Sequence, residues 1–152
     1  AISPFNAFQI IQGLETVTVR MKHHGSNAET DKAFLSKHDK VQKVIYSTLH
    51  KGEVGQRAKK YFNGGNGALI GFELKGGLEA GKKFIDNLKM LYHVANIGDA
   101  RSLAIHPAST THSQLSEKDQ IAAGVTPGYV RLSIGIEHPD DIIADIDQAL
   151  SA

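Results

Sequence analysis

The sequence predicts an α/β (α+β) fold in which helices cover a small sheet. Apolar residues recur every three or four positions near the N-terminus, as on one face of an amphipathic helix. Residues 129–136 alternate between apolar and polar side chains, as in a strand with one buried face. Between these segments, short apolar runs alternate with helical patterns. No repeat or linker divides the 152 residues, so we expect one domain over residues 1–152.

A long helix is expected at the N-terminus. Ser3 and Pro4 form an N-cap followed by proline at the first helical position. The apolar residues behind them predict a helix of about five turns, and they are Phe5, Phe8, Ile11, Leu14, Val17 and Met21. Gly25 is expected to interrupt this helix, and a second helical stretch should follow over residues 28–35.

The rest of the chain predicts a series of strands and helices. Apolar runs indicate strands at residues 41–46, 68–74, 91–95 and, most clearly, 129–136. Helical patterns occupy residues 53–62, 78–88, 116–123 and 139–150. The last helix begins with Pro139, Asp140 and Asp141, and the two acids favour the positive end of the helix dipole. Periodicity does not decide the direction of the strands.

The composition excludes several classes of protein. The apolar fraction of 41%, the charged fraction of 22% and the formal net charge of +1 are ordinary for a globular domain. Lysines and arginines are interleaved with acids, so we expect no nucleic-acid partner. The absence of cysteine excludes disulfides and thiolate sites and fits a reducing compartment such as the cytoplasm. No apolar run reaches the ~18 residues of a membrane span, so no membrane partner is expected.

Arg131 is the best-placed functional candidate. Its strand puts Val130, Leu132 and the following apolar residues on one face and Arg131 on the other, beside Ser133 and Gly135. A planar guanidinium held on a rigid strand next to two small residues suits a bidentate carboxylate ligand. A solvated or salt-bridged arginine would produce the same pattern.

Two further motifs predict no site. Gly76-x-x-x-x-Gly81-Lys82-Lys83 approaches a phosphate-binding loop, but Lys83 stands where a serine or threonine must reach magnesium. Adjacent His23 and His24 would point about 100° apart on a helix, and His106 and His112 lack a third ligand at a recognised spacing. We therefore expect neither nucleotide nor metal binding.

Four segments resemble the PLP-dependent Cys/Met-metabolism (transsulfuration) family. They are SPFNAFQIIQGLETVTVRMKHHGSNA, GGLEAGKKFIDNL, NIGDARSLAIHPASTTHSQL and GVTPGYVRLSIGIEHPDDIIADI. Their order and length make the chain similar to the C-terminal small domain of a pyridoxal-phosphate (PLP) fold-type I transferase. The resemblance implies a small, mostly antiparallel sheet covered by helices, with the N-terminal helix joining it to a large PLP-binding domain.

The same resemblance implies roles for three residues. Arg131 stands where the family has the arginine that binds the α-carboxylate of the amino-acid substrate. Asn96 matches the position whose backbone, alone or with its side chain, helps to hold that carboxylate, and Thr111 is a candidate for lining the pocket. The Schiff-base lysine and the other PLP contacts of the family belong to the large domain. No catalytic, cofactor-binding or metal residue is therefore expected in this chain, which should be inactive alone.

Within the family, Asn6, Asn96 and the HPASTTHSQL segment look most like O-acetylhomoserine sulfhydrylases. The resemblance then implies a cytoplasmic, homo-oligomeric parent enzyme, a dimer or tetramer. It would make homocysteine or methionine from O-acetyl-L-homoserine and sulfide or methanethiol by PLP-dependent γ-replacement. A cystathionine or methionine γ-lyase, a γ-synthase, and a free-standing non-catalytic module of the same fold are the alternatives.

Overall fold

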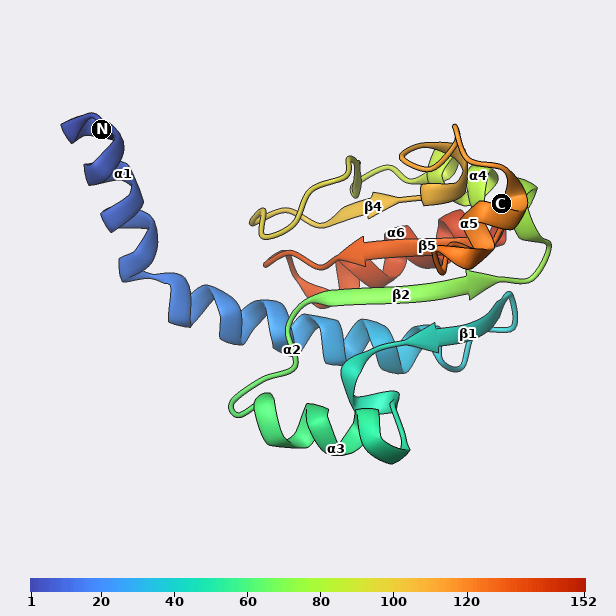
Figure 1. Cartoon of the computed structure of the whole chain (residues 1–152), viewed down its shortest axis with the longest axis horizontal. Coiled ribbons are helices and arrows are strands. Elements are labelled where there is room, and N and C mark those ends of the chain that lie inside the picture. Colours follow the sequence, from blue (N-terminus) through green and yellow to red (C-terminus); the bar gives the residue numbers. More distant parts are fainter.

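The computed structural model describes all residues, 1–152, and is built on a five-stranded sheet (Figure 1). The strand order is β1-β2-β5-β4-β3. The strands are β1 (Val41–Ile45), β2 (Leu69–Leu74), β3 (Tyr92–His93), β4 (Leu103–Ile105) and β5 (Tyr129–Ser133). Only β3 and β4 pair in parallel, and the other neighbours are antiparallel. The expected small, mostly antiparallel sheet is confirmed.

Three helices cover one face of the sheet and form the core with it. They are α2 (Val17–Leu35), α4 (Gly77–Asn87) and α6 (Pro139–Ser151). The helices α2 and α4 contact the strands, and α6 packs against both of them. The side chains that β2 and β5 direct toward them are fully or nearly fully buried: Ile70, Phe72, Leu74, Val130 and Leu132. Each such apolar side chain contributes about 1.5–3 kcal/mol when it leaves water. The apolar face predicted for β5 is therefore the core face.

A buried carboxylate ties α6 to the turn before β3. The Asp145 carboxylate accepts hydrogen bonds from the backbone N–H groups of Lys89, Met90 and Leu91, at 2.9, 2.9 and 3.0 Å. A turn outside regular structure leaves backbone donors that must find partners when buried. Asp145 supplies them from a helix more than fifty residues later in the chain.

Smaller elements border the sheet. The helix α3 (Gly52–Tyr61) and the 3₁₀ turn Ser47–Leu49 flank β1 and β2. The 3₁₀ turn Pro107–Ser109 and α5 (Glu117–Ala122) follow β4. His106 is fully buried against Gly81 of α4, where its Nε2–H donates to Pro127 O at 2.7 Å and Nδ1 accepts from Ser109 Oγ at 2.8 Å. Burial lowers the pKa of His106, so this histidine is a neutral structural residue.

The near phosphate-binding motif is explained by packing. A Cβ at Gly81 would overlap the His106 ring, so glycine is required for α4 to approach the 106–109 turn. Gly76 and Gly77 have φ values of 102° and 63°, which glycine adopts readily where the chain turns from β2 into α4. These glycines therefore serve a turn and a close contact.

The N-terminal helices differ from the prediction. The expected helix from Pro4 to Met21 is broken at Thr16, whose φ and ψ of −106° and 4° leave the helical region, so α1 (Pro4–Glu15) and α2 are separate. Gly25, the predicted interruption, lies inside α2. Glycine costs only about 1 kcal/mol in a helix, which the packing of α2 on the sheet and α6 offsets. Figure 1 shows α1 projecting away from the sheet, and none of its residues is buried.

Strand lengths were also mispredicted. The expected strand at 91–95 forms only at Tyr92–His93, and the expected strand at 129–136 ends at Ser133. The strand β4 was missed because its three residues are buried on both sides, which removes the alternation that marks a strand. None of the helices combines the length and the apolar surface that a bilayer crossing demands.

Candidate functional site: an arginine on the open face of the sheet

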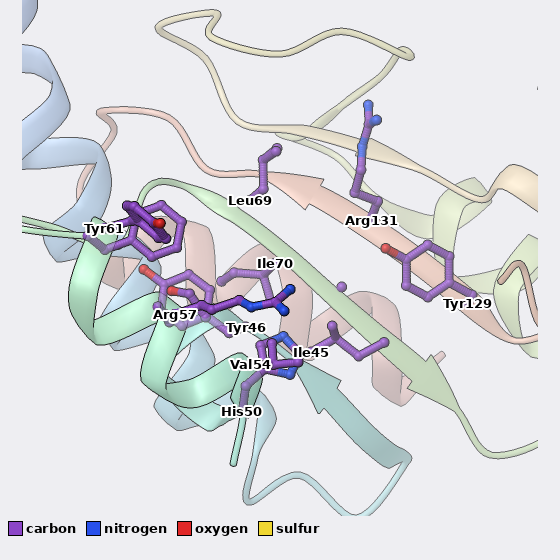
Figure 2. A pocket seen from close by; sticks show the side chains of 14 residues that line it. Ile45, Tyr46, His50, Val54, Arg57, Tyr61, Leu69, Ile70, Tyr129 and Arg131 are labelled. Carbon is purple, nitrogen blue, oxygen red and sulfur yellow. The ribbon is translucent and has the colours of Figure 1, made fainter. Parts of the chain in front are cut away.

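A groove of about 510 Å³ lies between α3 and the sheet face opposite the core (Figure 2). Its lining combines apolar side chains with a few polar ends: Ile45, Tyr46, Ser47, His50, Val54, Arg57, Ala58, Tyr61, Phe62, Leu69, Ile70, Gly71, Tyr129 and Arg131. A concave apolar surface with few polar groups is typical of small-molecule sites. Arg131 stands at its edge, and Figure 2 shows this side chain directed away from α3.

Arg131 is held in the middle of the sheet. In the strand register it lies between Gly71 of β2 and Ile105 of β4. Its Nη2 donates a hydrogen bond to the carbonyl oxygen of Asn96 at 3.1 Å, while its Nε is buried without a partner. None of the salt bridges in the molecule includes Arg131. The guanidinium charge is therefore not neutralised within the chain, and its Nη end is the part that a ligand can reach.

Gly71 and Tyr129 shape the floor beside Arg131. A Cβ at Gly71 would lie 2.7 Å from the Tyr129 hydroxyl, so only glycine lets the tyrosine ring cross β2. Burial raises the pKa of Tyr129 against the opposing charge of Arg131, so the phenol is neutral near pH 7. The sequence placed Tyr129 on this face but offered no signal for Gly71 or for Arg57, which reaches the groove from α3.

The three predicted site residues are not all brought together. Asn96 reaches Arg131 through its main-chain carbonyl. Thr111 is exposed, its hydroxyl contacts the neighbouring His112 Nδ1 at 2.9 Å, and it does not line the groove. Arg131 and Asn96 are thus brought into contact, and a pocket-lining role for Thr111 stays a prediction.

The expectation that Ser133 and Gly135 leave room for a ligand is wrong for Gly135. A Cβ at Gly135 would lie 2.5 Å from the Ala100 carbonyl oxygen and would overlap the Glu137 carboxylate, so this space is filled by protein. Ser133 is buried and borders a separate apolar cavity of about 420 Å³ between α2 and the 66–69 and 97–98 segments. Gly135, which follows β5, therefore serves close packing of the Ala100–Arg101 segment.

The groove beside Arg131 contains neither a lysine nor a cluster of metal-ligating side chains. No lysine lines the groove, so a carbonyl cofactor would find no amine there for a covalent link. No group of three or more histidine, aspartate and glutamate side chains is close enough to hold a metal ion. The arrangement fits an anionic ligand taken by one arginine.

Similarity to known proteins extends over the whole chain. The model of the Cys/Met metabolism PLP-dependent enzyme family matches residues 1–151. The chain is 56% identical to O-acetyl-L-homoserine sulfhydrylase of Leptospira meyeri over 99% of this chain and 34% of that protein. It is 47% identical to L-methionine gamma-lyase of Fusobacterium nucleatum over 98% of this chain and 38% of that protein. The chain therefore spans about a third of the length of these relatives.

A solved structure shares the fold. A crystal structure from Campylobacter jejuni matches with a TM-score of 0.91 and 43% identity, over 100% of this chain and 36% of that one. That protein is described as an O-acetylhomoserine (thiol)-lyase and carries N'-pyridoxyl-lysine-5'-monophosphate. The expected fold, that of a part of a PLP fold-type I enzyme, is confirmed.

Proposed function

This chain belongs to the Cys/Met metabolism PLP-dependent enzyme family, and from that membership we propose that it is the substrate-carboxylate-binding C-terminal domain of an O-acetylhomoserine sulfhydrylase. The parent enzyme would join O-acetyl-L-homoserine to sulfide or methanethiol by γ-replacement and release acetate. One observation carries the proposal: the unpaired guanidinium of Arg131, held on the open face of the sheet against the Asn96 carbonyl. Identity to the Leptospira meyeri sulfhydrylase supports the subfamily.

Arg131 would act as the clamp for the α-carboxylate of the amino-acid substrate. Its Nε is buried, so the two Nη nitrogens would donate to the two carboxylate oxygens, while Nη2 also keeps its bond to Asn96. Fixing the carboxylate fixes rotation of the substrate about its Cα, and this orientation is the contribution of the chain to catalysis. PLP, when bound to the parent, withdraws electrons from the substrate. The lysine and phosphate contacts it needs would come from a large domain outside residues 1–152.

A second candidate is a methionine γ-lyase, because the Fusobacterium nucleatum enzyme of that name is 47% identical over nearly the whole chain. Both activities need the same carboxylate clamp and differ in their products. With O-acetyl-L-homoserine and sulfide, a sulfhydrylase forms homocysteine and acetate, whereas a γ-lyase converts methionine and water into a 2-oxo acid, ammonia and methanethiol. Measuring both products separates the two candidates.

We further propose that the parent is cytoplasmic and a homo-oligomer, a dimer or tetramer. The absence of cysteine supports a reducing compartment. The exposed apolar side chains of α1 support burial of this helix against another part of the assembly.

The test is substitution of Arg131 in the PLP-loaded enzyme that contains this chain and its large domain. Arg131→Ala should lower kcat/KM about 10- to 150-fold, because losing a charged hydrogen-bonding pair costs about 1.5–3 kcal/mol. Arg131→Lys should restore only part of the loss. The lysine ammonium keeps the positive charge but cannot donate two parallel N–H bonds to a carboxylate, as the planar guanidinium does. Wild-type kcat/KM in both variants, with PLP still bound by absorbance, would refute the proposal.

A matched control comes from the same face of the sheet. Lys43 of β1 is a cation that already pairs with Glu73 of β2 at 4.0 Å. Lys43→Ala removes a positive charge from this face without touching Arg131, and kcat/KM should stay within about twofold, as expected for an exposed pair.

A further inference from the structure

The segment that follows β5 is held by one carboxylate. Glu137 Oε1 accepts a hydrogen bond from the backbone N–H of Ser102 at 2.6 Å, and Oε2 accepts from the Ser102 hydroxyl at 2.9 Å. The Ser102 hydroxyl oxygen in turn accepts from the Gly135 N–H at 2.8 Å. Ser102 is fully buried. Two segments far apart in the sequence, 100–102 and 135–137, are thus joined by charge-assisted bonds.

The same two segments meet through the main chain. Ile136 N–H donates to the Ala100 carbonyl at 2.8 Å. The absence of a side chain at Gly135 lets Ala100 and Arg101 approach, because a Cβ there would lie 2.5 Å from the Ala100 oxygen and from the Arg101 carbonyl carbon. The contact therefore requires both the glycine and the carboxylate that follows it.

The segment after β5 is fixed from the other side by α2. Asn27 Nδ2 donates to the carbonyl oxygens of Gly135 at 3.1 Å and Glu137 at 2.8 Å, and His24 Nδ1 donates to Ile134 O at 2.6 Å. Both side chains are buried. The backbone around Glu137 is therefore fixed by α2, and the Glu137 carboxylate in turn binds Ser102. These hydrogen bonds connect α2 to the loop before β4.

That loop carries the partner of Arg131. It runs from Val94, whose N–H donates to Ala104 O at 3.2 Å, to Ser102. The loop is closed at both ends, and between them the Asn96 carbonyl accepts from Arg131 Nη2. At the Ser102 end, the Glu137 carboxylate acts together with the Tyr92 N–H, which donates to Ser102 O at 3.0 Å, and with the Arg101 guanidinium, which lies 4.3 Å from the Tyr92 ring centre. If this end moves, the Asn96 carbonyl moves with it, and the guanidinium loses the bond that fixes its orientation.

We propose that Glu137 is a positioning residue for the substrate carboxylate. Through Ser102 it fixes the Val94–Ser102 loop, and through the Asn96 carbonyl it sets the orientation in which Arg131 offers its Nη end. The inference rests on the proposed function of Arg131. It adds a residue that does not touch the substrate and whose effect should disappear when the guanidinium is absent.

The test is a double-mutant cycle in the PLP-loaded enzyme with its large domain. Glu137→Ala should raise KM for the amino-acid substrate about tenfold while kcat changes little, because ground-state and transition-state binding of the carboxylate weaken together. Glu137→Gln, which keeps an acceptor for the Ser102 N–H, should raise KM less. In an Arg131→Lys background Glu137→Ala should raise KM no further, since the guanidinium that the Asn96 carbonyl orients is already absent.

A matched control is Asp145→Asn. Asp145 is also a buried carboxylate that accepts three backbone N–H groups, but it lies on α6 against the Lys89–Leu91 turn, with no bond to the Arg131 loop. This variant should lower Tm and leave KM unchanged. PLP absorbance and Tm are recorded for every variant, and if Glu137→Ala does not fold, Glu137→Gln completes the same cycle.

The outcomes separate the two proposals. Additive effects of Glu137 and Arg131 substitutions on KM, or a lower Tm with unchanged KM as in the control, would overturn the positioning role of Glu137 alone. If Arg131→Ala and Arg131→Lys both keep wild-type kcat/KM with PLP bound, the proposed function fails, and the role assigned to Glu137 fails with it.

Discussion

Asp31 is a fully buried carboxyl group without a hydrogen-bond partner for either oxygen. It lies on the face of α2 that also buries His24, Asn27, Ala28 and Leu35 against the sheet and α6. Burial raises the pKa of Asp31 to about 7, and the nearby charge of Glu137 adds to the effect. A carboxyl group that loses water without gaining partners favours its neutral form. The folded protein therefore retains a proton at Asp31 over a range where the unfolded chain has lost it.

The raised pKa predicts that Asp31 destabilises the fold as pH rises. The folded pKa of about 7 lies above the unfolded value of 3.8, so the folded state binds more protons between these limits and stability falls with increasing pH. The loss of unfolding free energy caused by Asp31 is absent below pH 3.8 and complete above about pH 7. Relative to wild type, Asp31→Asn should gain about 3 kcal/mol of unfolding free energy between pH 4.5 and pH 8.

Urea unfolding of the chain at both pH values measures this difference. Asp39→Asn, at an exposed position, is the control and should show no comparable gain. Equal pH dependence in Asp31→Asn and wild type would show that Asp31 is not protonated in the folded chain.

Among the helices and strands, α1 departs most from what its sequence requires. An amphipathic helix gains stability when its apolar face is buried, yet the large apolar side chains of α1 are exposed, Phe5 by 66% and Leu14 by 61%. The predicted stripe continues into α2, where Val17 and Met21 are also partly exposed. A patch of this kind on a globular domain marks an interaction surface.

We therefore predict that the isolated chain self-associates through α1. Light scattering over a concentration series should show a rising apparent mass, and a hydrophobic dye should bind. Phe8→Glu, which places a charge in the stripe, should weaken association at least several-fold, because a charge cannot be buried unpaired without a large cost. Gln12→Glu adds the same charge at an exposed polar position of α1 and should have little effect. A monomer at every concentration, with no dye binding, would contradict the prediction.

The chain as a whole contains only some of the side chains that a PLP-dependent reaction needs. It holds the Arg131 guanidinium on a sheet without an acidic partner, but the groove around Arg131 contains no lysine, and no cluster of side chains forms a metal site. The relatives that it matches are about three times longer. We expect such a division to leave orientation of the substrate to this chain and the contacts to the cofactor to the rest of the parent.

This division predicts that the isolated chain folds but neither retains PLP nor catalyses sulfhydrylation. Added PLP has no anchoring lysine beside Arg131, so any absorbance band from exposed lysines should disappear on dialysis. The enzyme with its large domain is the positive control. A stoichiometric band that survives dialysis of the isolated chain would overturn the prediction.

Local sequence patterns were sufficient to predict the two faces of β5, the position of Arg131 and the start of α6. Alternation along a strand assigns each side chain to a face, and a proline with two acids marks the start of a helix. The order of long family motifs was sufficient to predict the class of fold, and it supplied the expected carboxylate-binding role of Arg131. The separation of α1 from α2 at Thr16 and the three-residue strand β4 lay below what such patterns resolve.

The surroundings of Arg131, in contrast, depend on tertiary packing. Its partner is a main-chain carbonyl 35 positions away, and any residue at position 96 would present the same atom. The role of Glu137 depends on a serine 35 positions earlier, and that of Gly135 on the space that Ala100 fills. Contacts of this kind leave no periodic pattern, because main-chain groups are common to all residues and their pairing depends on how distant segments pack.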